Sequence, residues 1–296
     1  MHFDIVLFLR KKIITMKHIW IFILLISASL SAQDEFSLGF SLGTSNYQGD
    51  LTPAGISNFG RTNVTGAAFL RLLHNDHFNT KINLQYGFIE ANDADGGPGR
   101  VGRNLSFWTH IWEASLIEEF NIIGYKAGTK RFLSPYVFGG IAVFHFNPKT
   151  EYLGQEVELQ PIGTEGQGIP GFAGPYDLFQ VAIPIGGGLK IAIGKDATLS
   201  IEAGGRKLFT DYLDDVSGPY IDSKILLDGN GPLAVALGNR QGEYLGTDPI
   251  NTPGAPRGNP DFLDWYFFST VSLAFYLDGD GSLFGRNMRV IPCFHF

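Results

Sequence analysis

Apolar and polar residues alternate along several segments of the chain. The segment FSLGFSLG at 36–43 has an apolar side chain at every second position and only serine or glycine between them. The segments KINLQYGF at 81–88 and TLSIEAGGRKLF at 198–209 show the same period of two. Because successive side chains of a β-strand point to opposite faces, this period predicts strands that are apolar on one face and polar on the other.

Five further segments bring the number of predicted strands to eight: 63–73, 105–122, 132–146, 179–194 and 264–277. The segment 132–146 is apolar on both faces, so its pattern does not give its orientation. The connections contain roughly 19, 5, 14, 9, 32, 3 and 53 residues, alternately long and short, as in transmembrane barrels with tight periplasmic turns and long extracellular loops. The sequence therefore predicts an all-β fold, an eight-stranded antiparallel transmembrane β-barrel over residues 33–277.

The polar faces of these strands carry charged residues, which would line the interior of such a barrel. This predicted lumen set consists of Arg71, Lys81, Glu113, Glu119, Lys190, Glu202 and Arg206. Because an unpaired buried charge is costly, we expect these groups to pair across the interior and to leave no conducting pore. Two charges fall on the apolar face, Glu118 and Lys207, near strand ends where a charge costs less than the ~2–4 kcal/mol of the bilayer midplane.

The first residues predict export. From Met16 the chain reads MKHIWIFILLISASLSAQ, a basic start followed by an apolar run and then small residues, as in a secretory signal peptide. We predict a signal peptide over 1–32 with cleavage near Ser31 or Ala32, and Met16 is an alternative start of translation. The barrel would then lie in the outer membrane of a Gram-negative cell, with 278–296 as a periplasmic tail.

Composition narrows the possible partners. Without residues 1–32 the chain has 18 basic and 28 acidic residues and a net charge of −10, which argues against nucleic-acid binding. The single cysteine, Cys293, excludes an internal disulfide and a cysteine-based zinc site. The expected partner is therefore outer-membrane lipid, and no small-molecule substrate is indicated.

Motifs that carry catalysis do not fit the chain. GGGLKIAIGK at 186–195 has the wrong glycine spacing for a P-loop, and LDGDGSLFG at 277–285 lacks the third acid and the distal glutamate of a calcium loop. The seven histidines are scattered and match no nucleophile motif. We therefore expect no catalytic residue, no cofactor and no enzymatic activity.

The segment TDYLDDVSGPY at 210–220 combines three carboxylates with apolar residues. A solvated acidic rim is the base expectation for such a loop. Asp211, Asp214 and Asp215 are weak candidates for a calcium site, because closely spaced carboxylates can share a hard cation. An ordered loop that docks a partner is the third possibility, since its apolar side chains need cover. The candidate partner residues are Glu165, Tyr212, Leu213, Asp214, Asp215 and Tyr220.

Several of these segments together resemble a known family. SNYQGDL (45–51), NPK (147–149), LQPIGTEGQG (159–168) and EAGGRKLFTDYLDDVSGPY (202–220) look like the PorG-like family of outer-membrane barrels, from bacteria that use the type IX (Por) secretion system. The resemblance covers nearly all of the mature chain. It implies a non-enzymatic component of the secretion machinery that contacts its periplasmic ring proteins, with the tail 278–296 able to touch the ring.

Two other functions stay open on the residues alone. The chain could be a structural or adhesion-type barrel that acts through its extracellular loops and has no part in secretion. An outer-membrane enzyme ranks last, because no constellation of residues supports it.

Overall fold

The computed structural model describes residues 35–52, 61–127 and 132–277. The predicted signal peptide, its cleavage site, Met16 and the tail 278–296 lie outside these residues. Among the described residues, no helix has both the length and the apolar character needed to cross a membrane.

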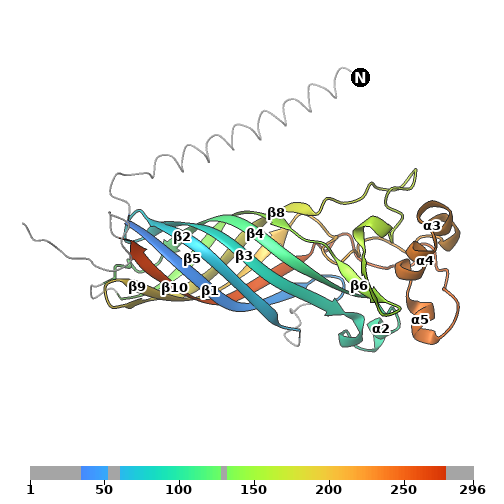
Figure 1. The fold of residues 1–296 in the computed structure, drawn as a ribbon, viewed down its shortest axis with the longest axis horizontal. Helices are drawn as coiled ribbons and strands as arrows, with labels where there is room; N and C mark the ends of the chain where they lie inside the picture. The colour runs from blue at the N-terminus through green and yellow to red at the C-terminus, as the bar shows by residue number, and fades with distance from the viewer. Residues whose placement is uncertain (1–34, 53–60, 128–131, 278–296) are drawn as a thin grey trace, which may run out of the picture.

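Eight long antiparallel strands form a closed barrel (Figure 1). They are β1 (Glu35–Gln48), β2 (Asn63–Leu73), β3 (Phe78–Asn92), β4 (Ser106–Asn121), β5 (Leu133–His145), β8 (Phe179–Ile193), β9 (Ala197–Leu208) and β10 (Trp265–Leu277). Neighbours in sequence pair throughout, and β1 pairs with β10 to close the ring. Closure leaves these strands without a free edge, which is a requirement for strands surrounded by hydrocarbon.

The predicted fold class is confirmed. Each of the eight predicted segments overlaps one barrel strand, and the boundaries differ by a few residues. The strand that the sequence left without an orientation, β5, points Tyr136, Phe138 and Phe144 inward, where they are buried. Its alternate residues Val137 and Val143 are exposed on the outside.

One proline interrupts the barrel wall. In the register of β5 with β8, Gly139 pairs with Ile185 and Ala142 with Ala182, and within these described strands Gly140 and Ile141 have no partner on β8. Pro184 lies opposite this gap, and a proline has no backbone N–H to donate to the ladder. On its other side Pro184 pairs with Arg206 of β9, so the wall stays continuous there.

The long connections form a cap at one end of the barrel (Figure 1). Its elements are η1 (Asp93–Asp95), α2 (Pro98–Val101), β6 (Lys149–Tyr152), β7 (Gln155–Glu158), η2 (Gln160–Ile162), α3 (Ser223–Asn230), α4 (Pro232–Gly238) and α5 (Gln241–Leu245). The described residues of the short connections, the start of β1 and the end of β10 lie at the opposite end. The sequence predicted these long connections only as loops. Local signals start the helices: the Asp222 side chain caps α3 by accepting hydrogen bonds from two backbone N–H groups, and Pro232 begins α4.

Candidate functional site

The outer wall of the barrel is an apolar belt. Its exposed side chains come from all eight barrel strands and include Phe40, Leu42, Val64, Leu84, Trp112, Val137, Ile141, Val143, Val181, Ile185, Ile201, Val271 and Leu273. A soluble monomer rarely exposes so large an apolar surface, whereas a membrane barrel needs one. A closed barrel with this outer surface is suited to span a membrane by its strands.

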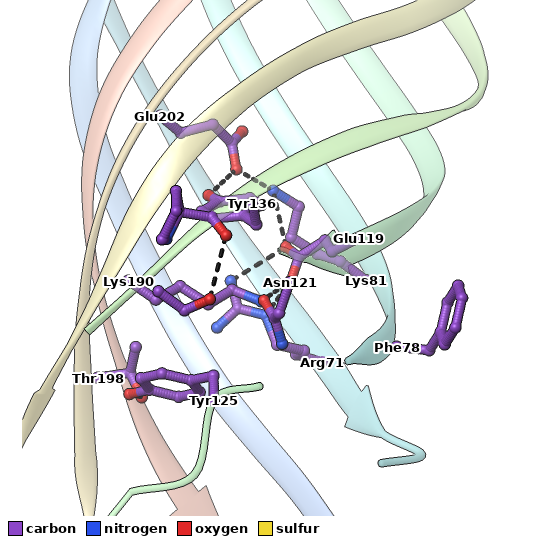
Figure 2. Close-up of polar contacts among 12 residues, drawn as sticks. Arg71, Phe78, Lys81, Glu119, Asn121, Tyr125, Tyr136, Lys190, Thr198 and Glu202 are labelled. Atoms are coloured by element: carbon purple, nitrogen blue, oxygen red, sulfur yellow. Dashed lines mark hydrogen bonds and ion pairs between the residues drawn. The ribbon is translucent and has the colours of Figure 1, made fainter. Parts of the chain in front are cut away.

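The interior near the short turns holds a network of ion pairs centred on Glu119 (Figure 2). The Glu119 carboxylate lies 2.9 Å from Arg71 Nε, 2.6 Å from Lys190 Nζ and 3.5 Å from Lys81 Nζ. Lys81 also pairs with Glu202 at 2.6 Å, and the Tyr136 hydroxyl donates to the same carboxylate at 2.8 Å. Six side chains from β2, β3, β4, β5, β8 and β9 are thus tied together across the lumen.

A second buried ion pair lies nearer the cap. Arg206 contacts Glu113 through Nε at 3.0 Å and through Nη2 at 3.3 Å, and the Tyr266 hydroxyl donates to Glu113 at 2.8 Å. The structure therefore places all seven predicted lumen residues inside the barrel, six of them buried and Glu202 14% exposed, where three carboxylates face four cations. Such an arrangement fixes the strands to one another and fills the space that a pore would need.

Toward the cap, an apolar core packs beside the Arg206–Glu113 pair, which the sequence did not predict. Inward-facing Ile89, Phe107, Ile111, Phe144 and Phe268 form one hydrophobic core that continues into the cap. The polar set therefore fills only part of the tube. The one signal for this core was the segment 132–146, whose apolar residues on both faces suit a strand that is buried inside and lipid-facing outside.

In the cap, Arg257 joins two distant segments of the chain. Its guanidinium contacts Glu165 at 2.6 Å and lies 3.8 Å from Asp215. Glu165 also accepts hydrogen bonds from the backbone N–H groups of Ser217 and Gly218. Asp215 accepts from the hydroxyls of Thr164 at 2.5 Å and Tyr176 at 2.8 Å. The segments 159–168 and 210–220 thus form one interlocked unit.

The three aspartates of 210–220 do not converge on a common point. Asp215 points to the group around Arg257, and Asp214 accepts from the Tyr47 hydroxyl at 2.6 Å and from Val216 N–H at 2.9 Å. Asp211 is buried beside the Ser217 side chain, away from the contacts of the other two aspartates. Among all the residues that the structure describes, no group of three His, Cys, Asp or Glu residues is arranged to hold a metal ion.

The expectation of a solvated acidic rim is wrong. Leu213 and Asp215 are 0% exposed and Asp214 is 1% exposed, while Tyr220 and Glu165 are also buried. Their apolar surfaces are covered within the cap, and their carboxylates accept hydrogen bonds there. These residues are therefore not exposed to a partner protein, as the sequence had suggested. Tyr212, the sixth candidate, is half-buried and stacks on Tyr176 with ring centroids 4.9 Å apart.

Burial changes the acidity of the cap carboxyls. It raises the pKa of Asp215 to about 6, although the nearby Arg257 works in the opposite direction. Burial also raises the pKa of Asp211 to about 7, although a hydrogen bond from the Ser217 side chain works in the opposite direction, and the negative charges of Asp50 and Glu165 add smaller contributions. The charges of these two carboxyls, and with them the net charge of the cap, therefore change with pH near neutrality.

Comparison with known proteins places the chain in a family. The profile described as "Domain of unknown function (DUF6089)" matches residues 15–230. The chain belongs to the DUF6089 family. The matched DUF6089 region includes β1 to β9 and ends within the cap, after α3. No curated protein sequence matches the chain.

Three solved barrels are similar to the chain. Ail, the attachment invasion locus protein of Yersinia pestis, is 9% identical, with a TM-score of 0.36 over 82% of this chain and 97% of that one. Neisserial surface protein A (NspA) is 8% identical, with a TM-score of 0.38 over 81% and 96%. OprG from Pseudomonas aeruginosa is 10% identical, with a TM-score of 0.38 over 82% and 95%. At these values, the fold assignment rests on the strand pairings of this chain itself.

Proposed function

We propose that this DUF6089 protein is an integral outer-membrane barrel that serves as a non-enzymatic scaffold of the type IX secretion machinery. The observation that supports a scaffold best is the filled interior. Ion pairs around Glu119 fill the part of the tube near the short turns, and the Arg206–Glu113 pair together with the core around Phe144 fills the part toward the cap. A barrel built in this way suits holding a position in the membrane better than passing a solute.

The family resemblance supports the secretion role. The two most distinctive segments of the resemblance, 159–168 and 202–220, contact each other in the cap through Glu165 and the backbone of Ser217 and Gly218. A shared pattern in two segments that pack together indicates a shared cap structure as well as a shared barrel. Contact with the periplasmic ring proteins would use the opposite end of the barrel, where the short turns lie.

Deletion of the gene tests the secretion role. If the chain serves type IX secretion, cargo proteins will accumulate in the periplasm, and re-expression of the wild-type chain will restore their export. Affinity purification of a tagged chain from outer membranes will then recover the ring proteins. Normal secretion in the deletion strain, or a pull-down without ring proteins, would contradict the proposal.

The cap surface favours a second candidate function, an adhesion-type barrel. Outside the lipid belt, α3 exposes Ile225 and Leu227, and α5 exposes Tyr244 and Leu245. Exposed apolar side chains on a folded surface are suited to contact another macromolecule. The double substitution Leu227→Ser and Leu245→Ser would reduce surface binding and leave secretion normal if this second function holds. The substitution Lys224→Ser on the same exposed surface is the matched control.

A further inference from the structure

The hydroxyl of Tyr47 lies between two buried carboxylates. It is 2.6 Å from Asp214 Oδ2 and 2.9 Å from Asp264 Oδ1. The exposed fractions of the three residues are 2%, 1% and 0%, so bulk water does not solvate the group. The other two carboxylate oxygens each accept one backbone N–H, from Val216 and from Leu213, both at 2.9 Å.

The number of hydrogens in this group decides its charge. A tyrosine hydroxyl has one hydrogen and can donate it to one carboxylate only. If both carboxylates were ionised, the other short contact would bring two oxygens together with no hydrogen between them. A proton on one carboxyl removes this conflict, because that carboxyl then donates to the Tyr47 oxygen while Tyr47 donates to the other.

The charged surroundings favour a retained proton. Burial raises the pKa values of both carboxyls; the negative charges of Asp50 and Asp211 add to this effect at Asp214, and those of Asp214 and Asp211 add to it at Asp264. Arg103, Arg240 and Arg257 are the cations near Asp214. The Arg103 guanidinium is engaged by the Asp93 carboxylate and by the backbone oxygens of Asp50 and Arg257, while Arg240 pairs with Glu243 and Arg257 with Glu165.

We propose that Tyr47, Asp214 and Asp264 bind one proton at neutral pH, and that this proton fastens the cap to the barrel. The triad joins the end of β1, the cap segment that follows β9 and the residue that precedes β10. The backbone packs closely around it, because a Cβ at Gly49 would overlap both the Tyr47 hydroxyl and Asp264 Oδ1. Loss of the proton would leave two buried negative charges at the point where these segments meet.

The direction of the pH effect follows from linkage. A carboxyl whose pKa is raised by folding stabilises the closed cap at low pH, and this contribution is lost as the pH rises toward the raised value. For one linked proton, the equilibrium constant for cap opening increases by up to about tenfold per pH unit in that interval. The cap should therefore open more readily in alkaline than in acidic medium.

Infrared spectroscopy of the full chain in detergent micelles tests the bound proton directly. At pH 8, where Asp211 with its pKa of about 7 is mostly ionised, the wild type should show the carbonyl stretch of a protonated carboxylic acid. Asp214→Asn and Asp264→Asn should each abolish that band, because an amide supplies the missing hydrogen and the remaining carboxyl ionises. Asp261→Asn, an exposed residue of the same connection, should leave it unchanged.

Hydrogen exchange of residues 209–264 between pH 5 and pH 9, corrected for intrinsic rates, tests whether the bound proton holds the cap closed. The pH dependence of cap opening should be shallower by about one proton in Asp214→Asn than in the wild type. Tyr47→Phe, which removes the shared hydroxyl, should increase cap opening while the barrel strands stay protected. A wild type without the acid band at pH 8, or equal pH slopes in wild type and Asp214→Asn, would overturn the proposal.

Discussion

Lys190 and Glu119 form a direct contact inside the barrel, with Lys190 Nζ 2.6 Å from a carboxylate oxygen of Glu119. The side chains are 1% and 0% exposed, and Arg71 contacts the same carboxylate from another strand. A carboxylate in this position holds together cations that would otherwise repel one another. The stability of the barrel interior therefore depends on Glu119 more than on any one of its partners.

Glu119→Gln should destabilise the barrel. The amide keeps the shape but removes the negative charge, and breaking a buried ion pair by removing one partner costs about 3–5 kcal/mol. Urea unfolding in detergent, followed by the shift between folded and unfolded bands on a gel, measures this loss. Glu151→Gln in the exposed hairpin of β6 and β7 is the control and should behave as the wild type. Equal unfolding midpoints for Glu119→Gln and the wild type would contradict the assigned role of Glu119.

Arg257→Met should loosen the cap and leave the barrel intact. It leaves the buried carboxylates of Glu165 and Asp215 without their cation, at a cost of about 3–5 kcal/mol. Limited proteolysis should then cut within 209–264 and leave the barrel strands protected. Lys224→Met, which removes an exposed cation of the same connection, should not change the cleavage pattern. Resistance of Arg257→Met to the protease would show that the cap does not depend on this ion pair.

Asp211→Asn should make the cap less sensitive to pH. Burial raises the pKa of Asp211 from 3.8 to about 7, so the neutral acid is the form that the folded cap favours. Its contribution to stability is fully present below pH 3.8 and is lost as the pH rises toward about 7. The asparagine is neutral throughout, and its cap-opening equilibrium, measured by hydrogen exchange, should vary less over this interval. Asp261→Asn should retain the wild-type dependence.

The purified protein should not conduct ions in a planar bilayer. The ion pairs around Glu119 and the aromatic core around Phe144 occupy the lumen at two levels. Single-channel recording at both polarities, with a porin as the positive control, measures this directly. Reproducible conductance steps of the wild type, with a size that changes in Arg206→Ala, would show that the interior carries water and ions.

The alternation of side chains was sufficient to predict the strands, because in a membrane barrel the lipid-facing residues must be apolar at every second position. It was also sufficient to identify the charges of the lumen, including Glu119 and Arg206. It could not predict the buried state of Asp215, because its cation, Arg257, lies 42 positions further along the chain. The helices of the cap were missed because they are short, so that local caps such as Asp222, and not a long apolar period, define them.

Pro184 in β8 leaves a gap in the backbone pairing between β5 and β8. Pairing between β5 and β8 stops at Gly139 and resumes at Ala142, so the hydrogen bonds on either side of the gap hold the two strands at this level. The closed ring therefore has fewer backbone hydrogen bonds here than in the uninterrupted pairings of β4 with β5 and of β8 with β9.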